Sequence, residues 1–195
     1  MFRVPLLIAL ALIITFGGGI LSALSALNAS VGFGAIRIGV WSAFPAAQTA
    51  EADPYAKAHR AKAGRLLYGS AEGLTFTASS DDKDFHLTGT CTYRLSGRTP
   101  TARLWTLYAA DGDGLPLVAG ADLPTALNSQ TVLRQRDGTF SVTISRNAKA
   151  GNWLALPDTG AFSLVLTLLD TPAAGSTGLI GLDMPGIETL GCGNE

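Results

Sequence analysis

The chain has 195 residues, of which 47% are hydrophobic and only 15% are charged, and its formal net charge is −1 at pH 7. This length allows one domain plus an anchor, or one larger domain. A nearly neutral chain offers no basic field, so we expect no nucleic-acid partner. The 23 glycines and 9 prolines suggest many turns, and the apolar content is too high for a disordered chain.

The N-terminal segment is the first predicted element. No ionisable side chain occurs between Arg3 and Arg37, and residues 4–27 are almost wholly apolar. A helix needs about 20 such residues to cross a bilayer core, whereas the apolar part of a cleaved signal peptide has roughly 7–15. The length therefore favours a retained transmembrane anchor, which spans residues 1–29, rather than a cleaved signal peptide. Cleavage stays an alternative, because small residues suited to a peptidase follow the apolar run: Ala23, Ser25, Ala26 and Ala29.

The orientation of this anchor follows from its flanks. Arg3 and the amino terminus carry the positive charge on the short side, which the positive-inside tendency keeps in the cytoplasm. We therefore predict a signal anchor, a single-pass protein of a bacterial inner membrane with its C-terminal domain in the periplasm. Gly18, Ser22 and Ala26 recur at a spacing of four, which would allow helix-mediated self-association. The alternative is that Gly and Ser are simply common in membrane helices.

A Gly- and Ala-rich stretch over residues 30–52 is predicted to be a linker next to the membrane. Its Trp41 fits either the membrane interface or the core of the first folded segment. Residues 53–64 predict a short helix. Asp53 can cap this helix, Pro54 suits its first turn, and Gly64 suits a left-handed exit.

Beyond Gly64 the periodicity becomes that of β-strands. Apolar residues alternate with polar or hydroxyl residues, and turn-forming Asp, Ser and Gly separate the runs. This spacing predicts a mainly β fold, an antiparallel β-sandwich or jelly-roll-like domain with one short helix, within residues 53–195. The predicted strands cover residues 74–78, 85–95, 103–108, 131–133, 139–144 and 162–169.

The two cysteines are Cys91, in a predicted strand, and Cys192, close to the end of the chain. A pair of cysteines in a translocated domain suggests a disulfide, which would tie the C-terminal tail to the sheet. Two unrelated buried thiols are the alternative.

A series of short motifs resembles a known bacterial family when the motifs are taken in order. They are Asp53-Pro54-Tyr55, Glu72-Gly73-Leu74-Thr75-Phe76, Cys91-Thr92-Tyr93-Arg94-Leu95, Leu104-Trp105-Thr106-Leu107, Gly151-Asn152-Trp153-Leu154 and Pro185-Gly186-Ile187 with Cys192. Each motif is weak alone. Their order, over roughly residues 53–192, resembles the family called domain of unknown function 1214, in its short membrane-anchored form.

This resemblance implies a β-rich, sandwich-like fold. In longer relatives the domain follows a second domain of unknown function, number 1254, in one polypeptide, so the resemblance implies a separate companion protein as partner. Longer relatives carry an aromatic, Arg-rich stretch after Phe162, where this chain has residues Leu166–Asp170, so functions of that edge do not carry over. The family has no agreed activity, so no catalytic residue is implied.

Metal and acidic motifs are weak. His59 and His86 are the two histidines, and neither has a neighbour at metal-ligand spacing, so we expect no transition metal and no cofactor. The run Asp111-Gly112-Asp113-Gly114 resembles the start of a calcium loop but lacks its distal acidic residues, which favours a turn. A second acidic group surrounds Lys83 and is best interpreted as a solvated loop tip: Asp81, Asp82 and Asp84.

Glu72, Trp105 and Trp153 form the candidate ligand groove. A carboxylate pair can act on a sugar, but the sequence identifies no partner for Glu72, whose default role is to bind turn amides. Tryptophans at strand spacing belong more often to a core. The first hypothesis is therefore a non-catalytic envelope protein that binds its companion. The alternative is an envelope domain that binds or hydrolyses carbohydrate or lipid. An exposed apolar patch or sheet edge would favour the first, and a concave polar pocket the second.

Overall fold

The computed structural model describes residues 3–29, 36–44, 52, 54, 57–58, 61, 73–172 and 183–193. The chain forms two compact units. One comprises Met1–Phe33 with Ala52–Leu66, and the other comprises Gly34–Glu51 with Leu67–Glu195. We describe each unit by itself.

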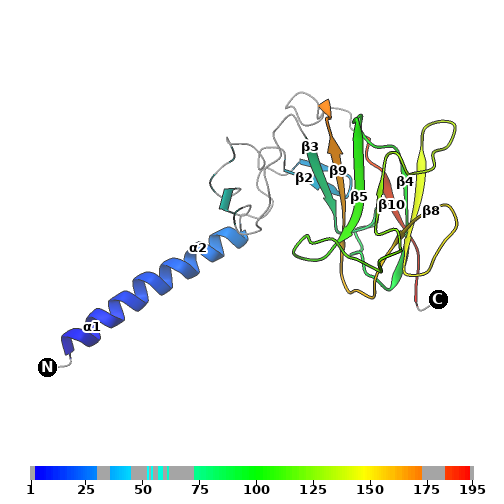
Figure 1. The fold of residues 1–195 in the computed structure, drawn as a ribbon. Coiled ribbons are helices and arrows are strands. Elements are labelled where there is room, and N and C mark those ends of the chain that lie inside the picture. Colours follow the sequence, from blue (N-terminus) through cyan, green and yellow to red (C-terminus); the bar gives the residue numbers. More distant parts are fainter. Residues whose placement is uncertain are drawn as a thin grey trace. The chain divides into compact units, whose positions relative to one another are not determined.

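The N-terminal helix is continuous in the order α1 (Arg3–Leu12), a π-helical turn η1 (Ile13–Gly17) and α2 (Gly18–Ala29) (Figure 1). Its span Arg3–Ser25 contains an 18-residue window with a mean hydropathy of 2.5, and it is long and apolar enough to cross a membrane. A signal sequence meets the same criteria of length and composition. The hydroxyl of Thr15 donates to the carbonyl oxygen of Ala11 at 2.8 Å, so this polar group is satisfied within the helix, as an apolar environment requires.

The short helix expected over residues 53–64 is described in part. Pro54, Lys57, Ala58 and Ala61 have helical backbone. The expected capping residues Asp53 and Gly64 lie outside the described residues.

The larger of the two sheets has six strands in the order β1-β2-β3-β9-β5-β6, and every neighbouring pair is antiparallel. Five consecutive residues of its β9, Leu164–Leu168, are buried, so both faces of this strand are covered. The strands are β1 (Ile36–Ile38), β2 (Trp41–Ala43), β3 (Gly73–Ala78), β9 (Ser163–Leu169), β5 (Leu104–Ala110) and β6 (Ala126–Asn128).

The smaller sheet has four strands in the order β10-β4-β7-β8. The β7–β8 pair is parallel and the other pairs are antiparallel, so this sheet is mixed. Its strands are β10 (Gly186–Cys192), β4 (Cys91–Gly97), β7 (Phe140–Ser145) and β8 (Asn152–Ala155).

The hydrophobic core lies between the two sheets. Trp105 on β5 stacks on Phe140 of β7, with ring centroids 5.0 Å apart, and these strands belong to different sheets. Tyr93 on β4 meets Phe162 edge-on at 5.9 Å. Aromatic pairs of this kind add to the stabilisation that burial itself provides. The mainly β sandwich that the periodicity predicts is thereby confirmed.

Trp41 is a core residue, which decides between the two interpretations of this side chain. It is 1% exposed, and its indole N–H donates to the carbonyl oxygen of Pro185 at 2.7 Å. The linker predicted over residues 30–52 therefore contains two strands of the larger sheet. The β1–β2 hairpin turns through Gly39 and Val40, and Gly39 has a φ of 57° that suits a residue without a Cβ.

Several strand predictions differ from the structure. Residues 131–133 are not a strand, and β6, β8 and β10 were not predicted. The long run 85–95 begins as turns and isolated bridges, and regular pairing starts at Cys91. The unpredicted strands β6 and β8 are three and four residues long, too short for a periodic pattern, whereas β10 is rich in Gly and has one buried side chain.

Candidate functional site

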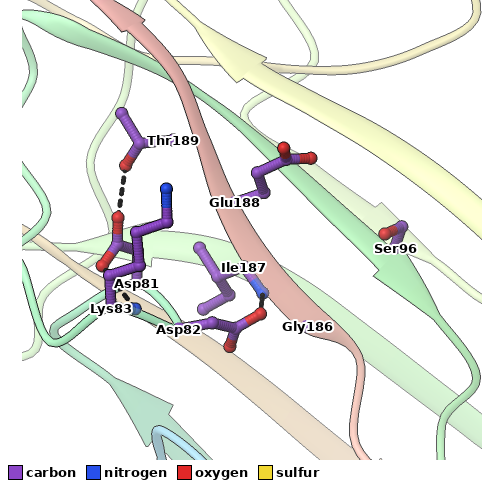
Figure 2. Close-up of a pocket in the computed structure, with 8 residues that line it drawn as sticks. All are labelled: Asp81, Asp82, Lys83, Ser96, Gly186, Ile187, Glu188 and Thr189. Carbon is purple, nitrogen blue, oxygen red and sulfur yellow. Dashed lines mark hydrogen bonds between the residues drawn. The ribbon is translucent and has the colours of Figure 1, made fainter.

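A shallow depression of about 280 Å³ lies where the loop between β3 and β4 meets the outer edge of β10 (Figure 2). Residues far apart in the sequence line it, and most of them are polar or charged. They are Asp81, Asp82, Lys83, Ser96, Gly186, Ile187, Glu188 and Thr189. We consider this depression as the candidate site.

Asp81 lies at the base of this loop and is 1% exposed. Its Oδ1 accepts hydrogen bonds from the backbone N–H groups of Lys83 at 3.0 Å and Phe85 at 2.9 Å. Its Oδ2 accepts a hydrogen bond from the hydroxyl of Thr189 at 2.6 Å. Burial raises the pKa of the Asp81 carboxyl group, but the three hydrogen bonds and the charge of Lys83 outweigh burial and hold the pKa below its ordinary value.

Asp82 pairs with β10 in the manner of a neighbouring strand. Its backbone N–H donates to the carbonyl oxygen of Ile187, and the Ile187 N–H donates back to Oδ2 of Asp82, both at 2.9 Å. A Cβ at Gly186 would lie 2.7 Å from this same Oδ2, so the glycine lets the carboxylate approach the strand.

The folded protein disfavours the ionised form of Asp82. Partial burial of its carboxyl group raises the pKa of Asp82, and the neighbouring charges of Asp81 and Glu188 raise it further, although the hydrogen bond from Ile187 opposes both effects. We refer to Asp81 and Asp82 with their partners Thr189 and Ile187 as the aspartate clasp. The two carboxylates of this clasp have opposite pKa shifts, so they should respond to pH in opposite ways.

Neutralising Asp82 should therefore stabilise the sandwich slightly. Because the folded-state pKa of Asp82 is raised, its ionisation lowers stability as pH rises through the ordinary aspartate range and up to the folded-state pKa. We expect Asp82→Asn to raise the free energy of unfolding at pH 7 by about 0.5 kcal/mol or less, since much of the side chain is exposed and solvent screens its charge. Urea unfolding at pH 7 and pH 3 would measure this, and a loss of stability at pH 7 would contradict it.

The chemistry available to the depression is limited by its internal bonding. The carboxylates of Asp81 and Asp82 already accept hydrogen bonds from Thr189 and Ile187. The Arg94–Glu188 ion pair on the rim, 3.2 Å long, joins two half-exposed side chains and contributes little. Within the described part of the chain, no three His, Cys, Asp or Glu residues are grouped so as to hold a metal ion. The clasp closes the free edge of β10.

The candidate groove residues do not lie on one described surface. Trp105 is buried in the core, where the guanidinium carbon of Arg134 lies 5.9 Å from its ring, and its Nε1 has no hydrogen-bond partner among the described residues. Trp153 is half-buried on β8, and its indole N–H donates to the carbonyl and hydroxyl oxygens of Ser145, both at 3.1 Å. Glu72 lies outside the described residues, so the groove stays a prediction.

Other sequence candidates have structural roles. Oδ1 of Asp111 accepts hydrogen bonds from the backbone N–H groups of Asp113 and Leu115, both at 2.9 Å, which is the chemistry of a turn. His59 lies outside the described residues. The disulfide is confirmed, because Cys91 is bonded to Cys192 and joins β4 to β10.

The clasp itself was missed at the level of the sequence. The sequence shows an acidic cluster around Lys83 and favours a solvated loop tip, whereas the structure buries Asp81. The cluster's partners Ile187 and Thr189 lie more than 100 residues further along, with separations of 105 and 108 residues. No local pattern connects the two segments. The Asp-Asp pair directly after a strand is the one signal that could have drawn attention to this loop.

The fold and the site define a two-sheet β-sandwich whose last strand is held to the sheet by a disulfide and by a carboxylate clasp, in a chain with an apolar N-terminal helix. The family model described as Protein of unknown function (DUF1214) matches residues 72–173. This match covers just over half of the chain, which therefore belongs to that family and confirms the resemblance in the motifs.

Two solved structures are similar to this chain. The VPA0106 protein of Vibrio parahaemolyticus matches with a TM-score of 0.56 and 18% identity, over 70% of this chain and 34% of that chain. An uncharacterised protein of Burkholderia cenocepacia matches with a TM-score of 0.42 and 22% identity, over 63% of this chain and 31% of that chain. The shared region is thus about a third of each solved chain, and at this identity the likeness to the Vibrio protein concerns the fold alone. A search of the curated proteins finds no match.

Proposed function

We propose that this protein is a non-catalytic binding module of the bacterial envelope that acts with a separate companion protein carrying domain of unknown function 1254. In this proposal the N-terminal helix is a single-pass anchor in the inner membrane, and the sandwich lies in the periplasm. The observation that carries it is a group of exposed apolar side chains on the loop between β5 and β6.

This loop, residues 111–125, presents three large apolar side chains to solvent. Leu115 is 63% exposed, Val118 is 67% exposed and Leu123 is 43% exposed. Single exposed leucines are common on soluble proteins and need no explanation. Three in one loop are more typical of an interaction surface, because removing apolar area from water is what a partner would gain there.

Backbone hydrogen bonds attach the first half of this loop, residues 111–117, to the sheet. The N–H of Leu117 donates to the carbonyl oxygen of Ala109 at 2.8 Å, and the N–H of Asp111 donates to that of Leu115 at 3.0 Å. Leu117 itself packs against the core. Leu115 and Val118, on either side of this attachment, are therefore presented from an ordered backbone, which lowers the entropy cost of binding.

The depression beside β10 supports a binding module more than an enzyme. A small-molecule or catalytic site needs convergent polar groups that are available to a ligand. Here the carboxylates of Asp81 and Asp82 are already engaged by Thr189 and Ile187. The length of the Vibrio chain supports a companion, because the match covers 34% of that chain and so leaves 66% of it outside the shared region.

The proposal is tested by co-expressing the full chain with its companion and measuring the complex in detergent by size-exclusion chromatography with light scattering. We expect Leu115→Ser with Val118→Ser to weaken the complex at least about tenfold, since each of the two lost apolar anchors costs on the order of 1 kcal/mol or more and a tenfold change corresponds to about 1.4 kcal/mol. Leu133→Ser is the matched control, because Leu133 is 69% exposed but belongs to another loop. No complex with the unaltered chain, or equal binding by all variants, would refute the proposal.

A further inference from the structure

The strand β10 is attached to the sandwich differently from the other long strands. All seven of its residues are described, and Ile187 is the one buried residue among them. By contrast, β9 has five buried residues and β7 has four. Hydrophobic burial therefore contributes little to holding β10, which lies at the edge of its sheet.

Two separate attachments hold the two halves of β10. The first half is held by the aspartate clasp, and just before it the carbonyl oxygen of Pro185 accepts the indole N–H of Trp41. The pairing with β4 is irregular between Thr189 and Gly191. Beyond this irregularity the disulfide joins Cys192 to Cys91, and the N–H of Gly193 donates to the carbonyl oxygen of Thr90 at 3.1 Å.

We propose that the Cys91–Cys192 disulfide is a redox-controlled latch on the second half of β10 and the residue that follows it, residues 190–193. In the oxidised protein the latch is closed and the edge of β4 is covered. In the reduced protein this half separates from β4, while the clasp retains the first half.

The position of the disulfide makes it accessible to a reductant. Residues Leu190–Cys192 are exposed and Cys91 is half-buried. A thiolate of a dithiol reductant attacks Sγ of Cys192, the Sγ–Sγ bond breaks, and Cys91 leaves as a thiolate that takes up a proton. The second thiol of the reductant then attacks the mixed disulfide and releases Cys192 as a thiol. Two electrons and two protons pass to the protein, and the reductant ends as a disulfide.

Opening the latch would uncover a strand edge. In the closed form Cys91 and Thr92 of β4 pair with Cys192 and Gly191 of β10. Once these pairs are lost, the outward backbone groups of this part of β4 become available to another extended segment. The second half of β10 has no buried side chain to oppose the separation, because every residue after Ile187 is exposed or half-buried.

Hydrogen–deuterium exchange of the full chain in detergent, followed by mass spectrometry, tests this latch with and without dithiothreitol. We expect the amides of residues 190–193 to exchange at least about tenfold faster after reduction, since local opening sets their rate. Amides of residues 187–188 and of the central strand β9 should remain far better protected than residues 190–193, because they exchange only through larger openings. The variant Cys91→Ser with Cys192→Ser should show the fast pattern without reductant and no response to it.

The variant Arg94→Gln with Glu188→Gln is the matched control, since it removes a cross-strand ion pair of 3.2 Å between the same strands and keeps the disulfide. It should retain slow exchange at residues 190–193 until reductant is added. Unchanged exchange at these residues after complete reduction, verified by thiol alkylation, would overturn the latch. Exchange throughout β9 as fast as at residues 190–193 would also overturn it, because the disulfide would then hold the whole fold and not one half-strand.

Discussion

Replacing both cysteines with serine is expected to lower the free energy of unfolding of the sandwich by about 2–5 kcal/mol. The disulfide joins residues separated by 101 positions, so it closes a long loop in the unfolded chain. In the chain-entropy model a loop of about 100 residues corresponds to roughly 4.7 kcal/mol. Urea unfolding followed by tryptophan fluorescence would measure the change, because Trp41 and Trp105 are buried in the folded sandwich.

The control for this prediction is the reductant itself. Dithiothreitol should lower the urea midpoint of the unaltered chain and leave that of Cys91→Ser with Cys192→Ser unchanged, because that variant has no bond to reduce. If the double variant unfolds at the same urea concentration as the oxidised chain, the disulfide contributes nothing measurable to stability. The prediction would then be wrong.

Replacing Asp81 with alanine is expected to lower the free energy of unfolding by about 3 kcal/mol. This value is the upper end of the range for losing a hydrogen bond to a charged group or for leaving a buried donor without an acceptor. Three donors lose their acceptor in this variant. They are the backbone N–H groups of Lys83 and Phe85 and the hydroxyl of Thr189. Because Thr189 belongs to β10, the loss should also loosen the first half of that strand. Urea unfolding at pH 7 would measure the effect.

The pH dependence of Asp81 provides a second measurement. Its folded-state pKa is lowered, so its contribution is fully present above the ordinary aspartate pKa of about 4 and is lost as pH falls through the folded-state pKa. The stability difference between the unaltered chain and Asp81→Asn should therefore be largest near pH 7 and shrink below about pH 4.

Asp84→Asn is the matched control for Asp81→Asn, because it makes the same charge change in the same loop. Asn also tolerates the φ of 64° at this position. We expect this control to change stability by less than about 0.5 kcal/mol. Equal effects of Asp81→Asn and Asp84→Asn would mean that the loop responds to net charge and not to the clasp.

Most of the candidate site could not be predicted from the sequence. Asp81 and Asp82 were visible as an acidic pair, but exposed acidic loops are common and carry no specific signal. Whether a carboxylate is solvated or buried depends on what packs against it, and here that is a strand more than 100 residues away, with Asp81 bonded to Thr189 at a separation of 108 residues. The sequence also could not distinguish the buried Trp105 from the half-buried Trp153. They both follow strand periodicity, and only the packing shows that Trp105 is core and Trp153 is half-buried.

The sequence by itself determined the elements whose signal is local. An apolar run long enough for a membrane predicted the helix Arg3–Ser25, and alternation over six or seven residues predicted β3, β5, β7 and β9. The two cysteines were enough to predict the bond between Cys91 and Cys192. Only the tertiary structure decided the short strands β1, β2, β6 and β8, the strand β10, and the clasp that holds it. Three- or four-residue strands and Gly-rich edges have no periodic pattern of their own, because their stability comes from the strand on which they pair.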